Sequence, residues 1–386
     1  MVNSRRPLFP EKPTHLSQTS RSVTTNVAPP APDFPGRFRR FWLELEKRGA
    51  DAFLVNHAPN LFYLFNVRPS AGFALCTRGE ALLILDSRYT EQAEAESVNC
   101  RLRKAEKSLE ETLQQAINDA ISPSASAFRL AIESRNLSFS AAQQIAAWNT
   151  KSQLIPGDEI LDNLRIKKEP YEIRAMEEAF RIAQTAFAEI SRAIIPDTTE
   201  VEIAGLFELE LRRLGADKAA FDTIVASGPR SSLPHGRATR RRIKEGELVL
   251  VDFGVQAAGY CSDLTRIHFP AGSSKPQIFD IVAEAQQKAI AATKPGVLTS
   301  AVDAAARDHI RESGYGDCFG HGTGHGLGLE VHEAPPVSWR SPRPLEEGMV
   351  FTIEPGIYLP GRHGVRIEDV VVVTADGCRL LSDPTR

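Results

Sequence analysis

The chain has 386 residues, which is long enough for two domains, and its hydrophobic (42%) and charged (25%) fractions are those of an ordinary soluble protein. A net charge of −3 argues against a nucleic-acid partner, and the lack of a long apolar run or a hydrophobic signal core argues against a membrane span or secretion. Five scattered cysteines without a Cys-x-x-Cys pair favour a reduced, cytoplasmic setting.

Residues 1–35 are rich in Ser, Thr, Pro and Asn and show no periodicity, which predicts a disordered tail. The same stretch contains Arg5, Arg6 and Arg21 and few acidic residues, a composition that is also typical of an organelle transit peptide. Of these two interpretations the tail is preferred.

Residues 36–155 are predicted to form a first, α/β domain. Apolar residues at helical spacing follow Gly36, and strands and helices then alternate over the length of a complete domain. The expected strands are AFLVN, NLFYLF, GFALCT, EALLILD and RLAIE, and the expected helices are YTEQAEAES, the region around residues 113–121, and AAQQIAAW. No convergent polar residues stand out here, so we expect the chemistry in the second half.

A polar stretch at residues 156–168, broken by a Pro-Gly pair, predicts a linker to a second domain at residues 169–386. That domain opens on a long helix, and Thr199 with Glu202 predicts a capping box at the start of the next helix. The elements expected after it are a strand in AAFDTIVAS, a loop, a hairpin, and helices near residues 275–293 and 299–311. The order of two helices, a sheet, two helices and a sheet suggests an internal duplication.

The predicted hairpin, at residues 247–270, contains two aspartates. If its strands pair about a centre between Ala257 and Ala258, Asp252 and Asp263 lie opposite each other on one face. Two opposed carboxylates on a half-buried sheet repel each other, so the arrangement requires a compensating cation. A single aspartate on a strand is often only a turn or edge residue, so this pair does not establish a metal site by itself.

Three histidines and two glutamates follow downstream. His321, His325 and His332 lie in HGTGHGLGLEVHE, which the glycines predict to be a loop and in which three of the nine histidines are concentrated. Glu354 ends an apolar strand in VFTIEPGIY, and Glu368 lies within a strand of β-branched residues in GVRIEDVVVV.

Together these segments supply four carboxylates and one imidazole. That number of hard oxygen donors exceeds the needs of a closed structural zinc site and suits two divalent ions that share bridging carboxylates. The candidate metal ligands are Asp252, Asp263, His325, Glu354 and Glu368.

In this order, the segments VDFG, CSDLTR, HGTGHG, TIEPG and VRIED resemble the metal-ligand set of the pita-bread metallopeptidases, specifically the Xaa-Pro peptidases aminopeptidase P and prolidase. The segments GADAFLVN, NLFYLF and LDSRYTEQA resemble the creatinase-type N-terminal domain of that family. The resemblance therefore implies an α/β N-terminal domain followed by an α+β pita-bread (creatinase/aminopeptidase) catalytic domain.

The resemblance also implies the role of each metal ligand. Asp252 would hold one metal ion, Asp263 and Glu368 would bridge both ions, and His325 and Glu354 would complete the second. Manganese is the metal that an oxygen-rich ligand set favours, with cobalt, iron and zinc also compatible.

Further residues match the family's substrate-side positions. His321 and His332 correspond to histidines that contact substrate and move protons, and Glu354 would relay a proton to the leaving nitrogen. His235 and Arg366 correspond to substrate-binding residues. The implied activity is hydrolysis of the Xaa-Pro bond, at the N-terminus of peptides or in Xaa-Pro dipeptides, by a hydroxide that bridges the two ions. A homodimer is implied by the resemblance alone.

Three alternatives remain. A metal-free, creatinase-like amidinohydrolase would lack several of the acidic ligands, all of which are present here. A catalytically silent binding module of the same fold would also have lost ligands, and it usually carries basic extensions. Methionine aminopeptidase shares the ligands but normally lacks this N-terminal domain and the VHEAP context.

Overall fold

The structure is a computed structural model that describes residues 31–382. The expected tail or transit peptide lies outside the described residues except at its end, where helix α1 (Phe34–Lys47) begins two residues before the predicted domain start at residue 36. Asp33 caps this helix by accepting a hydrogen bond from the Gly36 amide at 2.9 Å. Within the described residues, no helix combines the length and the apolar character needed to cross a bilayer.

The first domain is built on a six-stranded mixed sheet with the strand order β4-β3-β2-β1-β5-β6. The two hairpin neighbours β1–β2 and β2–β3 are antiparallel, and the other pairs are parallel. The strands are β1 (Ala52–Val55), β2 (Phe73–Thr77), β3 (Glu80–Leu85), β4 (Arg101–Lys104), β5 (Phe128–Ile132) and β6 (Ser152–Pro156). The helices after α1 are α2 (Ala58–Phe65), α3 (Thr90–Glu96), α4 (Leu109–Ala120) and α5 (Phe139–Trp148).

The segment NLFYLF, which we expected to be a strand, is most of helix α2. All six residues from Asn60 to Phe65 are buried, and a short, mostly apolar run has no periodicity that separates a buried strand from a buried helix. The deciding local signals are Pro59 in the first turn and Asn66, which ends the helix in the left-handed conformation at φ 60°.

The expected linker at residues 156–168 contains a helix, α6 (Asp158–Arg165). Acidic residues in its first turn and Arg165 in its last turn suit the helix dipole, and Ile160 and Leu161 are buried. The segment is polar because only one face of this short helix is buried.

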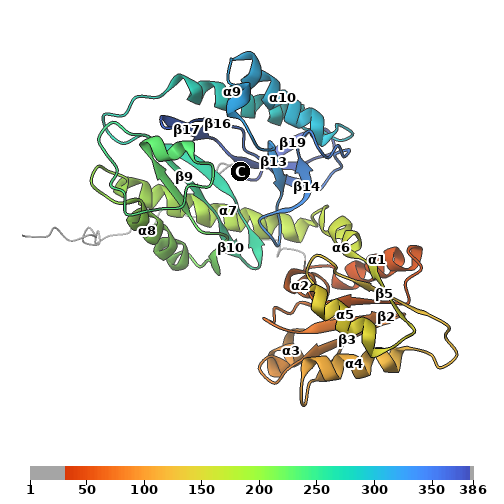
Figure 1. Cartoon of the computed structure of the whole chain (residues 1–386). Helices are drawn as coiled ribbons and strands as arrows, with labels where there is room; N and C mark the ends of the chain where they lie inside the picture. The colour runs from red at the N-terminus through yellow and green to blue at the C-terminus, as the bar shows by residue number, and fades with distance from the viewer. Residues whose placement is uncertain (1–30, 383–386) are drawn as a thin grey trace, which may run out of the picture. The chain divides into compact units, whose positions relative to one another are not determined.

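The second domain begins with helices α7 (Pro170–Ile190) and α8 (Glu200–Arg213). The predicted capping box of α8 is present: the Thr199 amide donates to Glu202 Oε2 at 2.8 Å, and the Glu202 amide donates to Thr199 Oγ1 at 3.3 Å. A second helix pair, α9 (Gln277–Ala292) and α10 (Thr299–Glu312), packs on the other side of the strands (Figure 1).

Between the helix pairs lie several small sheets, with the strand orders β11-β10-β7, β12-β9-β8, β14-β13-β15-β18-β19 and β16-β17. The segment expected as one strand after α8 is split into β7 (Lys218–Ala219) and β8 (Ile224–Ser227). The later strands are β13 (Gly324–Gly326), β14 (Glu333–Val337), β15 (Val350–Ile353), β16 (Gly356–Leu359), β17 (His363–Arg366), β18 (Asp369–Val373) and β19 (Cys378–Leu380). Short 3-10 turns cover residues Ser191–Ala193, Gly228–Ser232 and Gly316–Cys318.

The predicted hairpin forms from β9 (Val249–Phe253), β10 (Val255–Ala257), β11 (Tyr260–Cys261) and β12 (Leu264–His268), but its register differs from the expectation. Asp252 pairs with Thr265, and Ala257 pairs with Tyr260. The turn is therefore at Ala258–Gly259, where both residues have positive φ as in a type I′ turn. Alanine rarely adopts this conformation, so the sequence carried no clear signal for the turn position.

Candidate active site

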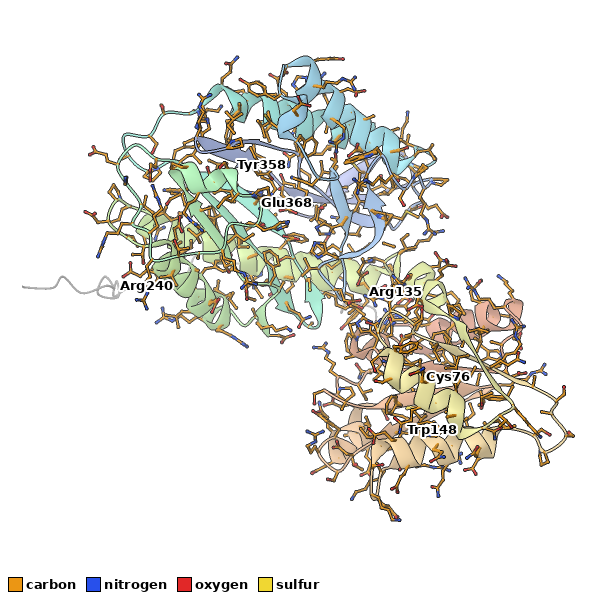
Figure 2. All side chains as sticks on the ribbon, viewed as in Figure 1. Cys76, Arg135, Trp148, Arg240, Tyr358 and Glu368 are labelled. Atoms are coloured by element: carbon orange, nitrogen blue, oxygen red, sulfur yellow. The ribbon has the colours of Figure 1, made fainter. Side chains whose placement is uncertain are left out.

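One cavity of about 380 Å³ in the second domain collects all nine side chains that the sequence singled out. Its walls come from β8, β9, the hairpin, the segment around β13, and the strands that follow β15. The nine are His235, Asp252, Asp263, His321, His325, His332, Glu354, Arg366 and Glu368. Tyr358 and Glu368 lie among the strands of this domain (Figure 2).

Asp252 is on β9, and Asp263 occupies the break between β11 and β12. In the observed register Asp263 lies across from Gly254. It is therefore displaced by two residues from the position directly opposite Asp252. A shift of two positions preserves the face, because side chains alternate along a strand. The two carboxylates therefore still point into one cavity.

His325 lies on strand β13 and not in a loop as expected. Its neighbouring glycines are needed because other backbone is very close: a Cβ on Gly324 would lie 1.9 Å from the Thr352 carbonyl oxygen, and one on Gly326 would lie 2.1 Å from that of Ala334. The glycines thus let β13 fit between β14 and β15. From the sequence we had expected them to let the backbone approach a ligand closely.

The tautomer of His325 suits a metal ligand. Nδ1 lies 3.0 Å from the Gly326 carbonyl oxygen, which can only accept, so Nδ1 carries the proton and Nε2 keeps its lone pair. That free Nε2 is 3.3 Å from Glu354 Oε1 and 3.7 Å from Asp263 Oδ2. One ligand atom each from Asp263, His325 and Glu368 lie within 4.8 Å of one another.

Neighbouring hydroxyl groups orient the glutamates. Thr265 Oγ1 donates to Glu368 Oε2 at 2.7 Å, and Thr352 Oγ1 donates to Glu354 Oε1 at 3.3 Å. Glu354 directly follows β15, as predicted, whereas Glu368 lies just before β18 rather than inside a strand. Both side chains are thereby fixed by hydrogen bonds from residues that neighbour the metal-ligand candidates.

The buried carboxylates of this cluster would be stabilised by a nearby positive charge. Burial, followed by the nearby carboxylates of Glu368 and Asp252, raises the pKa of Asp263 well above its usual value. Burial and then Glu354 raise the pKa of Glu368 in the same way, and burial raises the pKa of Glu354. Such shifts are typical of carboxylates held together out of water, and a bound cation would offset both the burial and the mutual repulsion.

The donor set therefore fits divalent cations. Asp252 Oδ1 is buried and accepts no hydrogen bond from any described residue, although its other oxygen accepts from Arg366 Nη2 at 2.6 Å. Unsatisfied buried carboxylate oxygens are costly unless a ligand completes them. The unpaired oxygen of Asp252, the free Nε2 of His325 and the raised pKa values of the carboxyl groups all fit the binding of a divalent cation.

Tyr358 was missed by the sequence analysis. Its hydroxyl accepts from Arg366 Nη1 at 2.9 Å and donates to His321 Nε2 at 2.9 Å, because His321 Nδ1 already donates to the Gly322 carbonyl oxygen. A chain of hydrogen bonds thus runs from Asp252 through Arg366 and Tyr358 to His321. A tyrosine on an apolar strand shows no pattern that separates this role from core packing.

Two histidines complete the cavity wall. The His332 ring centroid lies 4.2 Å from that of His325, and burial lowers the pKa of both imidazoles, which favours their neutral forms. His235 follows the turn at Gly228–Ser232 and lines the same cavity. Phe221 and Ile224, which the sequence analysis did not single out, supply an apolar wall.

The fold and the donor set together define a metal-dependent hydrolase of the pita-bread type. A model of the metallopeptidase family M24 matches residues 174–375, and a model of the creatinase/prolidase N-terminal domain matches residues 37–167. The chain belongs to metallopeptidase family M24. The predicted family and fold class are therefore confirmed.

Similar proteins come from several bacteria and archaea. An uncharacterised peptidase of Bacillus subtilis is 41% identical over 337 residues, which cover 86% of this chain and 94% of that protein. A Xaa-Pro dipeptidase of Pyrococcus horikoshii is 38% identical over 345 residues, 89% of this chain and 95% of that protein.

Solved structures with a similar fold include Xaa-Pro peptidases. An X-Pro aminopeptidase from Thermotoga maritima superposes with a TM-score of 0.81 at 38% identity and covers 89% of this chain and 98% of its own. A prolidase from Pyrococcus furiosus superposes with a TM-score of 0.82 at 36% identity and covers 89% of this chain and 99% of its own.

Proposed function

We propose that this protein is a metal-dependent peptidase that hydrolyses Xaa-Pro bonds, in dipeptides or at the N-terminus of longer peptides. The observation that carries the proposal is the buried convergence of four carboxylates and one imidazole, with an unpaired Asp252 oxygen and an unprotonated His325 Nε2. The Xaa-Pro substrate is inferred from relatives that are named Xaa-Pro dipeptidase, prolidase and X-Pro aminopeptidase.

The residues that would hold two divalent ions are Asp252, Asp263, His325, Glu354 and Glu368, with Asp263 and Glu368 shared between the ions. When bound, the ions supply Lewis acidity that polarises the scissile carbonyl group and makes hydroxide available near neutral pH. We propose manganese as the preferred ion, because oxygen donors outnumber nitrogen in the set.

The chain's own side chains position the substrate and move protons. Glu354 borders the cavity and would pass a proton to the departing proline nitrogen, which is tertiary in the amide and must be protonated to leave. His332 lines the cavity and would donate a hydrogen bond to the reacting carbonyl oxygen, whereas His321, which also lines the cavity, is proposed to move protons through its hydrogen bond with Tyr358. Arg366 orients Asp252, and with His235 it is proposed to contact the substrate.

A metal-free amidinohydrolase remains the alternative, but no observation favours it. All five metal-ligand candidates are retained, and the four carboxylates among them repel one another when no cation is bound. The structure thus argues for the metal-dependent reaction.

The deciding experiment compares hydrolysis of Ala-Pro and Ala-Pro-Ala by metal-stripped protein, with and without added Mn²⁺. Cleavage before proline that depends on the metal would support the proposal, and the preferred substrate length would distinguish a dipeptidase from an aminopeptidase. If neither peptide is cleaved with manganese, cobalt, iron or zinc, the proposal is wrong.

A further inference from the structure

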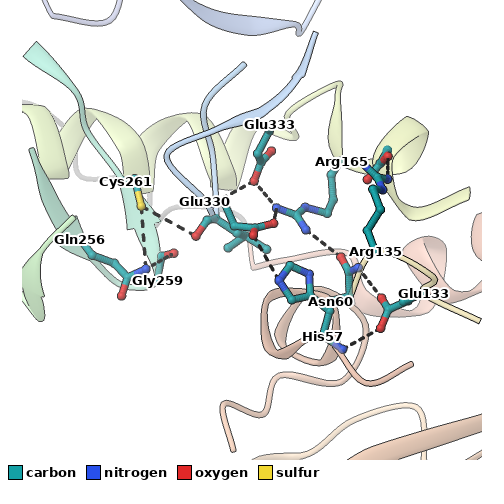
Figure 3. Close-up of polar contacts among 12 residues, drawn as sticks. His57, Asn60, Glu133, Arg135, Arg165, Gln256, Gly259, Cys261, Glu330 and Glu333 are labelled. Atoms are coloured by element: carbon teal, nitrogen blue, oxygen red, sulfur yellow. Dashed lines mark hydrogen bonds and ion pairs between the residues drawn. The ribbon is translucent and has the colours of Figure 1, made fainter. Parts of the chain in front are cut away.

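Five residues beside the catalytic cavity make a closed ring of polar contacts, in which one link is made by a backbone amide (Figure 3). Arg165 Nη2 donates to Glu330 Oε2 at 2.8 Å, and Glu330 Oε1 lies 3.2 Å from His57 Nε2. The His57 amide donates to Glu133 Oε2 at 2.6 Å, and Asn60 Nδ2 donates to Glu133 Oε1 at 2.5 Å. Arg165 Nη1 closes the ring by donating to Asn60 Oδ1 at 2.8 Å.

The ring joins three parts of the chain that are distant in sequence. His57 and Asn60 are at the start of α2 and Glu133 follows β5, so these three belong to the N-terminal domain. Arg165 ends α6. Glu330 belongs to the segment between β13 and β14, which leads into His332.

The guanidinium group of Arg165 contacts residues on both sides of His332 in the sequence. Arg165 Nη2 contacts Glu330, two residues before His332, and also Glu333, the residue after it. Glu333 Oε1 additionally accepts from the Glu330 amide at 3.0 Å, and Glu333 Oε2 lies 3.0 Å from Lys168 Nζ. The planar fork of arginine can reach Asn60 and two carboxylates at once, which a lysine cannot do.

The first half of the segment has support of its own, because Leu327 and Leu329 are buried and the Cys261 amide donates to the Gly328 carbonyl oxygen at 2.8 Å. Residues 327–332 form neither helix nor strand, and the His332 imidazole makes no hydrogen bond to any described residue. On one side of His332 is the catalytic cavity, and on another is a second cavity of about 540 Å³ that is lined by His57, Arg165 and Glu330. His332 thus lies between two cavities, and the polar contacts nearest to it along the chain are those of Glu330 and Glu333 with Arg165.

We propose that Arg165 and Glu330 are positioning residues for His332, and that the N-terminal domain sets the geometry of the active site through this ring. The inference rests on the proposed function, in which His332 contacts the reacting carbonyl group. It gives the N-terminal domain an indirect part in the chemistry, although all nine predicted site residues belong to the second domain.

Glu330→Ala is the most informative change, because the Glu330 side chain is 35% exposed and Arg165 keeps Glu333 as a partner. We expect kcat for Xaa-Pro hydrolysis to fall about 10-fold to 100-fold, since small displacements of a catalytic group have effects of this size. KM and the bound metal content should stay near the wild-type values. Glu330→Gln keeps an oxygen acceptor for Arg165 and should restore most of kcat.

The matched control is Glu159→Ala. Glu159 is also on α6 and accepts from Arg48 Nη2 at 2.6 Å, but it lies outside the ring and its side chain is 75% exposed. This variant should keep the wild-type kcat. An equal loss of kcat in both variants would overturn the proposal.

A double mutant tests whether Glu330 acts through His332. If it does, adding Glu330→Ala to His332→Ala should cause no further loss of kcat. Losses that multiply would show that Glu330 acts independently of His332, and the proposal would be wrong.

Hydrogen exchange tests the ring without relying on activity. Backbone amides of residues 327–334 should exchange at least about 10-fold faster in Glu330→Ala than in wild type or Glu159→Ala, because the segment loses its contact with His57 and one of its two contacts with Arg165. Equal exchange in the three proteins would overturn the proposal. If wild type cleaves no Xaa-Pro substrate, the proposed function fails, and the exchange rates still decide whether the ring holds the segment.

Discussion

At the scale of single residues, the active site is a cluster of buried carboxylates whose negative charge a bound cation would balance. Asp252 has one paired and one unpaired oxygen, and the pKa values of Asp263 and Glu368 are raised by burial and by neighbouring carboxylates. Arg366 offsets part of this negative charge: although burial opposes its ionisation, Tyr358, Asp252 and Glu354 hold the pKa of Arg366 well above its usual value. One guanidinium cannot balance four carboxylates, so we expect a bound cation to stabilise the site.

Asp263→Asn tests the role of the shared ligand. The amide keeps the shape but removes the negative charge, so we expect metal affinity and activity to fall at least about 100-fold, the upper range seen even for residues that only support ligands. The metal-free variant should be more stable than metal-free wild type, because one repulsive charge is gone. Metal analysis and thermal unfolding measure the two effects. Full activity with undiminished bound metal would refute the ligand assignment.

At the scale of elements, the position of His325 depends on how closely three strands approach one another. Strand β13 is short, and glycines flank the histidine on both sides because β14 and β15 leave no room for a side chain there. The same closeness aligns the His325 amide with Thr352 Oγ1 at 3.0 Å. The metal-ligand geometry is therefore a property of the sheet as much as of the histidine.

Gly326→Ala should disturb both stability and metal binding. The new Cβ would lie 2.1 Å from the Ala334 carbonyl oxygen, so β13 and β14 must separate. We expect a loss of about 1 to 3 kcal/mol in the free energy of unfolding, which is typical of overpacked sites. Gly377→Ala is the control, because no atom lies within 4 Å of its added Cβ. Chemical denaturation of both variants, with equal midpoints, would contradict the expectation.

At the scale of the whole molecule, a buried ion cluster makes the fold sensitive to acid. Although burial opposes ionisation of Glu333, Lys168 and Arg165 more than compensate and lower its pKa from 4.5 to about 2. The stabilisation is complete above the unfolded-state pKa and is lost as pH falls toward the folded-state pKa. It amounts to about 3 kcal/mol, from a shift of roughly 2.5 units.

The measurement is urea unfolding of metal-free wild type and Glu333→Gln across this pH range. Their difference in unfolding free energy should shrink as pH falls from about 5 to about 2, because Glu333 is protonated in both folded and unfolded wild type at the acidic end. A difference that does not change with pH would show that the carboxylate charge does not stabilise the fold.

We also expect a homodimer, an expectation that comes only from the family resemblance. Sedimentation of the full chain at micromolar concentration should give twice the monomer mass. A single monomeric species under these conditions would end the expectation.

Several local features could be predicted from the sequence, because they depend on nearby residues. The capping box of Thr199 and Glu202, the helices α9 and α10, and the helix–sheet–helix–sheet order followed from short-range patterns. Two predictions were wrong because the local signal was ambiguous: the position of the turn at Ala258, and the strand expected at NLFYLF, which is a helix.

The sequence by itself also determined the family and the chemical types of the candidate ligands, because the donor residues stand in short motifs in a recognisable order. Only the tertiary structure decided which atoms meet: the Tyr358 link between Arg366 and His321, and the contacts of Arg165 with Asn60 and Glu330. The residues in the Arg165 contacts are separated by more than 100 positions, and no local pattern records which segments packing will bring within hydrogen-bonding distance.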